Sequence, residues 1–433
     1  MKDIFKKIIS KTMELEARMV LRKYKPKIVA VTGSVGKTST KDAIYTAMSG
    51  SFFVRKSEKS FNSDIGIPLT ILGCQNAWSN PLMWIKNILV GLSSIIFKEK
   101  YPEWLVLEVG ADRPGDIRKI TKWLKPDIVV ITKFAKVPVH IEFFESRDDL
   151  INEKWYLVRA LKTGGTLVIN ADDEDSVEMS KDFSGQIIKY GFDNPANVKA
   201  ENLDYLYEDG ESNKKVMGIS FRINYEGNSL PMFVRGSVGI PNIYSILASV
   251  AVGFVNKINP VKINEMFAEH DTPKGRMKLI KGIKGSTIID DTYNSSPLAV
   301  ASALQTLNDI KTKGRKIAVL GDMMELGKLS SEEHYNAGKI AGEFCDLILT
   351  VGMRSKKLAE GALDANLDEG KIFQYDDSVT AGKEFQNEIK EGDLILVKGS
   401  QSMRMEKFVL EIMAEPEKAE ELLVRQEEEW LAR

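Results

Sequence analysis

Apolar runs rich in β-branched residues alternate with helical patterns between about residues 27 and 191. The clearest predicted strands lie at 28–32, 104–109, 128–132 and 166–170. Strands that alternate with helices predict a mainly parallel sheet covered by helices on both faces. Ligands of such sheets bind beyond the carboxyl ends of the strands. We therefore expect residues 33–38, Glu108 and 133–140, which follow three of these strands, to face a ligand.

The pattern changes after about residue 198. Short alternating segments with polar turns, such as 218–225, predict antiparallel strands attached to the first unit. Residues 242–255 predict a helix rich in small and apolar residues, and the polar stretch 269–276 has the composition of a linker. A second α/β unit follows, with predicted strands at 286–290, 316–320, 347–351 and 394–398. The ending, 415–433, predicts one charged helix with a solvated face.

Two apolar patterns lie outside this alternation. Near the N-terminus Ile4, Phe5, Ile8, Ile9 and Met13 recur at helical spacing with lysines between them. This pattern predicts an amphipathic helix within 1–26, which either packs on the next domain or lies on a membrane surface.

The second apolar pattern, 81–97, is almost continuous and is interrupted by Lys86 and Asn87. A spanning helix needs about 20 mostly apolar residues, so this segment predicts a buried or surface-docked helix. Peripheral membrane contact through 81–97 is a hypothesis that follows from this cluster.

Composition narrows the class of protein. A chain of 433 residues predicts two or three domains. Its 60 basic and 61 acidic residues leave no overall field that would attract nucleic acid, so no nucleic-acid partner is expected. Cys74 and Cys345 cannot form a zinc cluster of their own and indicate a reducing compartment. Because the first residues are too charged for a signal peptide, we expect a cytoplasmic protein.

The segment that follows the first predicted strand carries the clearest chemistry. Small residues in a turn let backbone N–H groups converge on a phosphate, and a helix N-terminus adds favourable polarity. Lys37 would bring a charge to the outer phosphates, and the Thr38 hydroxyl would reach Mg²⁺. The general phosphate-loop pattern wants glycine at 31, where this chain has Val31, and an ordinary strand-turn-helix corner is the alternative. The residues predicted to bind nucleotide phosphates are Gly33, Ser34, Gly36, Lys37, Thr38 and Ser39.

Seven motifs together resemble the Mur ligases, which use ATP to join amino acids or peptides to cell-wall precursors. Within that family the resemblance is to the type that adds D-alanyl-D-alanine (the MurF type). The motifs occur in family order between about 27 and 413, and the ordered set is specific. They are Thr-Gly-Ser-Val-Gly-Lys-Thr-Ser at 32–39, Asn-Ser-Asp-Ile-Gly-Ile-Pro at 62–68, Glu-Val-Gly-Ala at 108–111, Gly-Arg at 275–276, Asp-Asp-Thr-Tyr-Asn at 290–294, Gly-Asp-Met-Met-Glu-Leu-Gly at 321–327 and Val-Lys-Gly-Ser at 397–400.

The resemblance implies an α/β fold in which 1–26 precedes a phosphate-loop-type central ATP-binding domain, 27–273, with a mainly parallel sheet. A C-terminal Rossmann-like α/β domain, 274–433, would bind the acceptor. It further implies an acyl-phosphate mechanism, in which a carboxylate attacks the γ-phosphate of ATP and an amine then displaces phosphate. Cations must neutralise the charge that grows on the transferred group.

The resemblance also assigns cofactors and metal ligands. ATP and two Mg²⁺ ions are implied, with Thr38 on the first ion and Glu108 and His140 on the second. Lys154 aligns with a lysine that family members carry as a carbamate, which would bridge to the second ion. The implied catalytic residues are therefore Lys37, His140 and Lys154. For His140 a structural role, and for Lys154 a place on a helix surface, are the plainer alternatives.

The remaining predicted site residues divide between nucleotide and substrate. The resemblance implies that the nucleotide is also held by Asn242, Arg276, Asp291 and Asn294. At the expected adenine contacts Pro241 and Ser245 depart from the family pattern. The candidate substrate residues are Asn62, Asp64, Asp322, Glu325, Lys398 and Ser400. For Ser400 an ordinary β-to-α turn is an equal alternative. Closing the two domains would assemble this site.

The donor is where the chain departs from the family. Family ligases carry an N-terminal domain that grips a uridine-diphosphate sugar, whereas about 26 residues precede the ATP domain here, so we expect that clamp to be absent or reorganised. The expected partners are a small cell-wall precursor and a dipeptide or amino-acid acceptor, bound by a monomer. A related ligase with another acceptor or a lipid-linked donor is one alternative. A non-catalytic ATP-binding scaffold is another, disfavoured because a scaffold needs no second metal site.

Overall fold

The computed structural model describes residues 2–58, 60–78, 80–138, 140–193, 195–208, 215–268 and 270–431, with the side chains of 2–7 left out. The predicted apolar positions Ile4 and Phe5 therefore lie outside the described side chains.

The first sheet is built around the strand that precedes the phosphate-binding turn. Strand β1 (Lys27–Thr32) lies between β3 (Trp104–Glu108) and β4 (Ile128–Ile131), parallel to both. The sheet order is β2-β3-β1-β4-β5-β6-β7-β8-β9. Its remaining strands are β2 (Val54–Lys56), β5 (Thr166–Asn170), β6 (Gln186–Gly191), β7 (Val198–Tyr207), β8 (Val216–Tyr225) and β9 (Asn228–Arg235). Pairing is parallel as far as β7 and antiparallel from β7 to β9, which confirms the predicted mainly parallel sheet with an antiparallel extension.

Helices cover both faces of this sheet because β1 alternates its buried side chains. Val29 and Val31 belong to a core shared with α2 (Lys37–Ser49) and α8 (Ile240–Val255). Ile28 and Ala30 point into the opposite core. The other helices of this unit are α1 (Lys2–Tyr24), α3 (Gly66–Leu72), α4 (Pro81–Ile96), α5 (Asp116–Ile120), the short 3₁₀ turn η1 (Ile141–Phe143), α6 (Arg147–Arg159), α7 (Glu174–Ser180) and α9 (Pro260–Phe267).

The second sheet has the order β10-β11-β15-β12-β13-β14. Its strands are β10 (Lys278–Lys281), β11 (Thr287–Asp291), β12 (Lys316–Gly321), β13 (Leu347–Val351), β14 (Ile372–Tyr375) and β15 (Leu394–Lys398). Pairing is parallel except between β10 and β11, which confirms the predicted second α/β unit. Its principal helices are α10 (Pro297–Asp309), α11 (Ser330–Gly342), α12 (Lys356–Asp364), α13 (Ser378–Phe385) and α14 (Glu406–Ile412).

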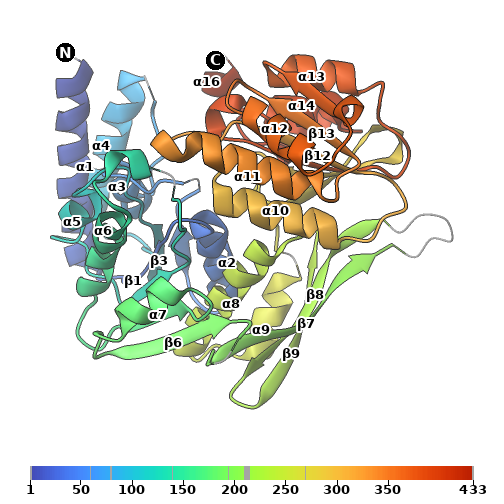
Figure 1. The fold of residues 1–433 in the computed structure, drawn as a ribbon. Helices are drawn as coiled ribbons and strands as arrows, with labels where there is room; N and C mark the ends of the chain where they lie inside the picture. Colours follow the sequence, from blue (N-terminus) through green and yellow to red (C-terminus); the bar gives the residue numbers. More distant parts are fainter. Residues whose placement is uncertain are drawn as a thin grey trace.

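The two units lie against each other through helices from both (Figure 1). Helix α10 of the second unit contacts α8 of the first, and their apolar residues belong to one core. The register pairs Asp291 with Lys398, so both residues stand at the carboxyl ends of neighbouring strands of the second sheet. This edge faces the end of β1 and the start of α2.

The predicted single helix at 415–433 is wrong. The segment forms η6 (Pro416–Lys418), α15 (Ala419–Leu422) and α16 (Glu428–Leu431), with an irregular stretch between the last two. Leu423 is buried, and Arg425 adopts a left-handed backbone conformation with φ 60. Charge composition predicted a solvated helix, but the side chains of Leu423 and Arg425 are buried. The left-handed conformation of Arg425 also interrupts the helix.

Helices α1 and α4 pack together at one edge of the molecule (Figure 1). The side chain of Asn80 caps α4 by accepting the N–H groups of Leu82 and Met83. Among the described residues, no helix has both the length and the apolar character needed to cross a membrane.

Candidate active site

A cleft of about 860 Å³ lies between the two units and is lined by residues of both. It brings together most of the residues that the sequence predicts for the site. Those that line it are Ser34, Gly36, Lys37, Thr38, Ser39, Asn62, Glu108, His140, Lys154, Asn242, Arg276, Asp291, Asn294, Glu325, Lys398 and Ser400. Gly33, Asp64 and Asp322 are not among its lining residues.

The turn after β1 requires glycine at two positions. A Cβ on Gly33 would lie 2.0 Å from Oγ1 of Thr132, and Gly36 has φ 81, which L side chains rarely adopt. Val31, where the general pattern has glycine, lies inside β1 and is fully buried. The strand therefore continues to Thr32, and Gly33 makes the turn instead. The hydroxyl of Ser34 has no hydrogen-bond partner within the described part of the chain and lines the cleft.

Two lysines meet at one backbone oxygen beside this turn. Nζ of Lys37, at the start of α2, donates to the carbonyl of Gly33 at 3.0 Å. Nζ of Lys154, on α6, donates to the same oxygen at 3.1 Å. Burial lowers the pKa of Lys37, and burial and then the charge of Lys37 hold the pKa of Lys154 well below its usual range. Both pKa values are lowered because the two amines are buried beside the same backbone oxygen.

A carboxylate at the end of β3 lies beside the start of α2. The Thr38 hydroxyl donates to Oε2 of Glu108 at 2.9 Å and lies 2.8 Å from the hydroxyl of Ser60. Nδ2 of Asn62 donates to Oε1 of Glu108 at 3.3 Å. These are hard oxygen ligands of the kind that Mg²⁺ prefers.

No cluster of three or more His, Cys, Asp or Glu residues that could hold a metal occurs among the described residues. Mg²⁺ bound to a nucleotide usually takes one or two protein ligands and completes its shell with phosphates and water. The Thr38–Glu108 pair therefore fits such an ion.

His140 joins the two units. Its Nε2 lies 3.4 Å from Oδ1 of Asp112 in the first unit, and its Nδ1 lies 2.9 Å from Oε2 of Glu325 in the second. His140 has φ 70, and burial lowers the pKa of its imidazole against the opposing effect of the Glu325 carboxylate. Both ring nitrogens therefore face carboxylates, and His140 would act as a metal ligand only by giving up one of these two contacts.

The wall from the second unit carries both signs of charge. Nζ of Lys398 lies 2.5 Å from Oδ2 of Asp291 and 3.0 Å from the carbonyl of Asn294. Burial lowers the pKa of Lys398 although Asp291 opposes that effect. The guanidinium of Arg276 stacks 4.1 Å from the ring centre of Tyr293, and its Nε has no hydrogen-bond partner among the described residues. A cation held in this way can receive an anion without breaking an existing ion pair.

Two predicted substrate residues have other surroundings. Asp64 is exposed outside the cleft. Asp322 is buried, and its Oδ1 accepts the N–H of Ser355 at 2.7 Å, so it supports the turn before α12. Gly33 contributes its carbonyl to the two lysines without lining the cleft itself.

The start of α8, where the sequence predicts contacts to the nucleotide base, forms another wall of the cleft. Nδ2 of Asn242 donates to the carbonyl of Val238 at 3.0 Å. The hydroxyl of Ser245 donates to the Pro241 carbonyl and accepts from Thr40. Tyr244 also lines the cleft, with its hydroxyl donating to Asp172 at 2.9 Å. Asn242 and Ser245 are thus already committed to local hydrogen bonds.

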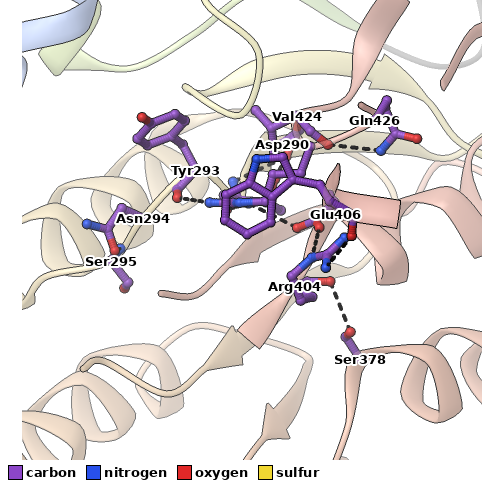
Figure 2. Close-up of polar contacts among 12 residues, drawn as sticks. Asp290, Tyr293, Asn294, Ser295, Ser378, Arg404, Glu406, Val424 and Gln426 are labelled. Carbon is purple, nitrogen blue, oxygen red and sulfur yellow. Dashed lines mark hydrogen bonds and ion pairs between the residues drawn. The ribbon is translucent and has the colours of Figure 1, made fainter. Parts of the chain in front are cut away.

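Residues near the C-terminus form a further wall of the cleft that the sequence did not predict. Trp430 and Arg404 line the cleft, and Nη1 of Arg404 donates to the Trp430 carbonyl at 3.0 Å. Arg425 donates to Oε2 of Glu406 at 3.0 Å and to the carbonyl of Thr292 at 3.2 Å. Figure 2 shows Arg404 against Glu406 in this cluster. Because 415–433 is acidic, the sequence predicted a solvated helix there and gave no sign that Arg425 is buried or that Trp430 lines the cleft.

Comparison with known proteins places both units in one family. Residues 31–253 match the Mur ligase middle domain, and residues 275–401 match the Mur ligase, glutamate ligase domain. The UDP-N-acetylmuramoyl-tripeptide–D-alanyl-D-alanine ligase of Bacillus subtilis is 28% identical over 401 residues, which cover 92% of this chain and 79% of that protein.

Solved structures have the same fold. MurF ligase from Thermotoga maritima in complex with ADP superposes with a TM-score of 0.74 at 25% identity, over 95% of this chain and 84% of that one. MurF from Acinetobacter baumannii superposes with a TM-score of 0.73 at 23% identity, over 92% of this chain and 79% of that one. At that identity the second comparison supports the fold alone.

Proposed function

This chain belongs to the Mur ligase family, and from that premise we propose that it joins a muramoyl-peptide carboxylate to the amine of D-alanyl-D-alanine. The reaction is an ATP-dependent ligation of the kind that builds peptidoglycan precursors. The single observation that carries the proposal is the cleft itself. Lys37 and Glu108 line the cleft from the first unit, and Lys398 and Asp291 line it from the second.

The phosphate turn would hold the triphosphate of ATP. The N-terminus of α2 has no acidic residue in its first turn and no side-chain cap, so its N–H groups are available to phosphate oxygens. Lys37 would release the carbonyl of Gly33 and turn to the outer phosphates. Ser34 would donate its hydroxyl to the same anion.

Mg²⁺ would be held by Thr38 and Glu108, with His140 as a further ligand. When bound, the ions would neutralise charge on the transferred phosphoryl group. The chain's own contribution is to fix the ligands, because Asn62 and Ser60 hold Glu108 and Thr38 in place. In the first step a donor carboxylate oxygen bonds to the γ-phosphorus and ADP leaves.

Lys154 would carry a carbamate. Only the neutral amine reacts with carbon dioxide, and burial favours that neutral form. The new N–C bond would release one proton and convert the amine to an anion. That change would remove the repulsion between Lys154 and Lys37 and would add an oxygen ligand beside the phosphate turn.

The second unit would bind the acceptor dipeptide. Lys398 and Ser400 would receive its carboxylate, while Asp291 would contact the nucleotide. In the second step the amine nitrogen bonds to the acyl carbon, inorganic phosphate leaves and the amine loses a proton. Arg276 and Asn294 would contact the nucleotide from the same side of the cleft.

A Mur-type ligase with a lipid-linked donor is the second candidate. The observation that favours it is the exposed apolar face of α4, because such a face suits contact with a membrane. Peripheral contact through 81–97, a cytoplasmic location and a monomeric state are parts of this proposal.

The test is phosphate release from ATP with defined donors and acceptors. We expect release that requires both a muramoyl tripeptide and D-alanyl-D-alanine, and its loss in Lys37→Met but not in Lys136→Met, whose lysine is exposed outside the cleft. Release with a lipid-linked donor alone would favour the second candidate. Nucleotide binding without release for any donor and acceptor would contradict both.

A further inference from the structure

Helix α4 exposes a row of large apolar side chains to solvent, although Met83, Ile88 and Ile95 pack partly against the core. The residues that face inward are Trp84, Asn87, Gly91 and Ser94, three of which are small or polar. The outward residues recur at spacings of three and four and are 42 to 75% exposed: Leu82, Ile85, Leu89, Leu92 and Ile96. An amphipathic helix on a globular protein normally has the opposite arrangement.

Polar contacts on the inward side fix this orientation. Nδ2 of Asn87 donates to the carbonyl of Gln75 at 2.8 Å. Gly91 leaves room for Glu16 of α1, whose Oε2 would lie 2.2 Å from a Cβ at position 91. Nζ of Lys23 donates to the carbonyls of Ser94 and Ile95, both at 3.0 Å. Rotating α4 to bury its leucines would break each of these contacts.

Helix α1 adds to the same region. It packs beside α4 at the edge of the molecule (Figure 1). Ile8, Leu15 and Met19 of α1 are exposed while Met13 and Val20 are buried. We call α1, α4 and the turn at 97–100 the apolar platform. Both helices thus expose large apolar side chains, and exposed apolar patches on a protein mark interaction sites.

Basic residues border the apolar platform. Lys86 lies on α4, Lys98 and Lys100 lie in the turn that follows it, and Lys11 lies on α1, all four exposed. These lysines outnumber the exposed acid of the turn, Glu99. Lysines beside an apolar face bind the headgroups of anionic lipids while the apolar side chains enter the acyl boundary.

We propose that the apolar platform docks the protein on an anionic lipid bilayer. A helix of 16 residues is too short to span it, so α4 would lie in the interface. A second copy of the chain fits less well. In a two-fold interface each patch meets itself, so the lysines would face their own copies.

The segment just before the apolar platform contacts one wall of the cleft. Trp78, just before α4, packs edge-on against Trp430 with ring centres 6.2 Å apart, and Trp430 lines the cleft. Docking would therefore bring one wall of the cleft close to the membrane. The inference deepens the second candidate above, which includes peripheral contact through 81–97, by naming an anionic bilayer as the partner, and it does not depend on the ligase reaction.

Flotation of the purified chain with vesicles tests the proposal. Vesicles of phosphatidylcholine with phosphatidylglycerol should carry the protein, with less binding in high salt and less to phosphatidylcholine alone. Ile85→Ser with Leu89→Ser should weaken binding on the order of a hundredfold, since two apolar side chains no longer leave water. Lys86→Glu with Lys98→Glu should weaken binding to anionic vesicles only.

The matched control is Phe233→Ser with Val261→Ser, two residues of similar exposure on other elements. It should bind vesicles like the wild type. Phosphate release in vesicle-free buffer should be unchanged in all three variants, which separates docking from ligation. Absence of flotation, equal flotation of the serine variant, or a wild-type dimer that the serine variant dissociates would each overturn the proposal.

Discussion

The imidazole of His140 lies 2.9 Å from the carboxylate of Glu325, so that one residue of each unit meets the other across the cleft. Glu325 was predicted to hold substrate, but this contact suits a different role. A carboxylate on Nδ1 orients the imidazole, and a metal ion on Nε2 would take the place of the Asp112 carboxylate, whose Oδ1 lies 3.4 Å away. Glu325 would then make the metal site depend on the position of the second unit.

Glu325→Gln is expected to weaken metal binding by about 10- to 100-fold, because an amide orients the imidazole less strongly. Mn²⁺ titration monitored by paramagnetic broadening in the presence of ADP measures this. Glu332→Gln, on the exposed side of α11, is the control. Equal Mn²⁺ affinity in the two variants would remove Glu325 from the metal site.

Gly33→Ala is expected to abolish nucleotide binding. The new methyl group would lie 2.0 Å from the Thr132 hydroxyl, so the turn must shift and its N–H groups no longer converge. Calorimetric titration with ADP measures the loss. Gly227→Ala has a positive φ but no described residue within 4 Å of its Cβ, so it shares the backbone strain without the collision and should bind ADP normally.

Lys154→Ala is expected to lose most ligase activity, and short-chain carboxylic acids should restore part of it. The added acid would supply the anion that a carbamate provides beside the phosphate turn. Lys162→Ala, an exposed lysine paired with Asp127, serves as the control. Turnover that is unchanged in Lys154→Ala would exclude the carbamate.

Stability is expected to fall as pH rises because of Glu16. Burial raises the pKa of this carboxyl from its ordinary 4.5 to about 7, and neither oxygen has a hydrogen-bond partner among the described residues. The folded state therefore holds a proton that the unfolded chain releases, so the free energy of unfolding decreases between pH 4.5 and 7 and then levels.

Glu16→Gln should raise the free energy of unfolding at pH 8 by up to about 3 kcal/mol and leave it nearly unchanged at pH 4. Urea unfolding across this pH range measures the effect. Glu14→Gln, a half-exposed carboxylate on the same helix, is the matched control. A constant difference between wild type and Glu16→Gln at all pH values would contradict the buried charge as its cause.

Local patterns predicted the strands and the phosphate turn because their signals lie within a few residues. The β-branched residues of β1 favour an extended strand whatever packs against it. Gly33 and Gly36 specify the turn because both have positive φ values there. Asp322 shows the limit of such reasoning. Its motif placed it after a strand, but sequence cannot tell whether a carboxylate points to a cleft or supports the next helix, as its bond to Ser355 does.

Contacts between distant segments could not be predicted. The pairing of His140 with Glu325 depends on how two separately folded units meet, and no periodicity encodes that. The same holds for Trp430, which follows an acidic stretch yet packs against Trp78. The acidic composition of that stretch did not reveal that Arg425 is buried and hydrogen-bonded to Glu406 and Thr292.

The contact between Trp78 and Trp430 provides an intrinsic optical sensor. The two indoles belong to different units, whereas Trp84, Trp104 and Trp155 are buried within the first. Any motion that widens the gap between the lobes would change the emission of this pair and leave those three largely constant. Recording this fluorescence during a titration with nucleotide or acceptor would then follow the relative motion of the two units in real time, with no dye attached.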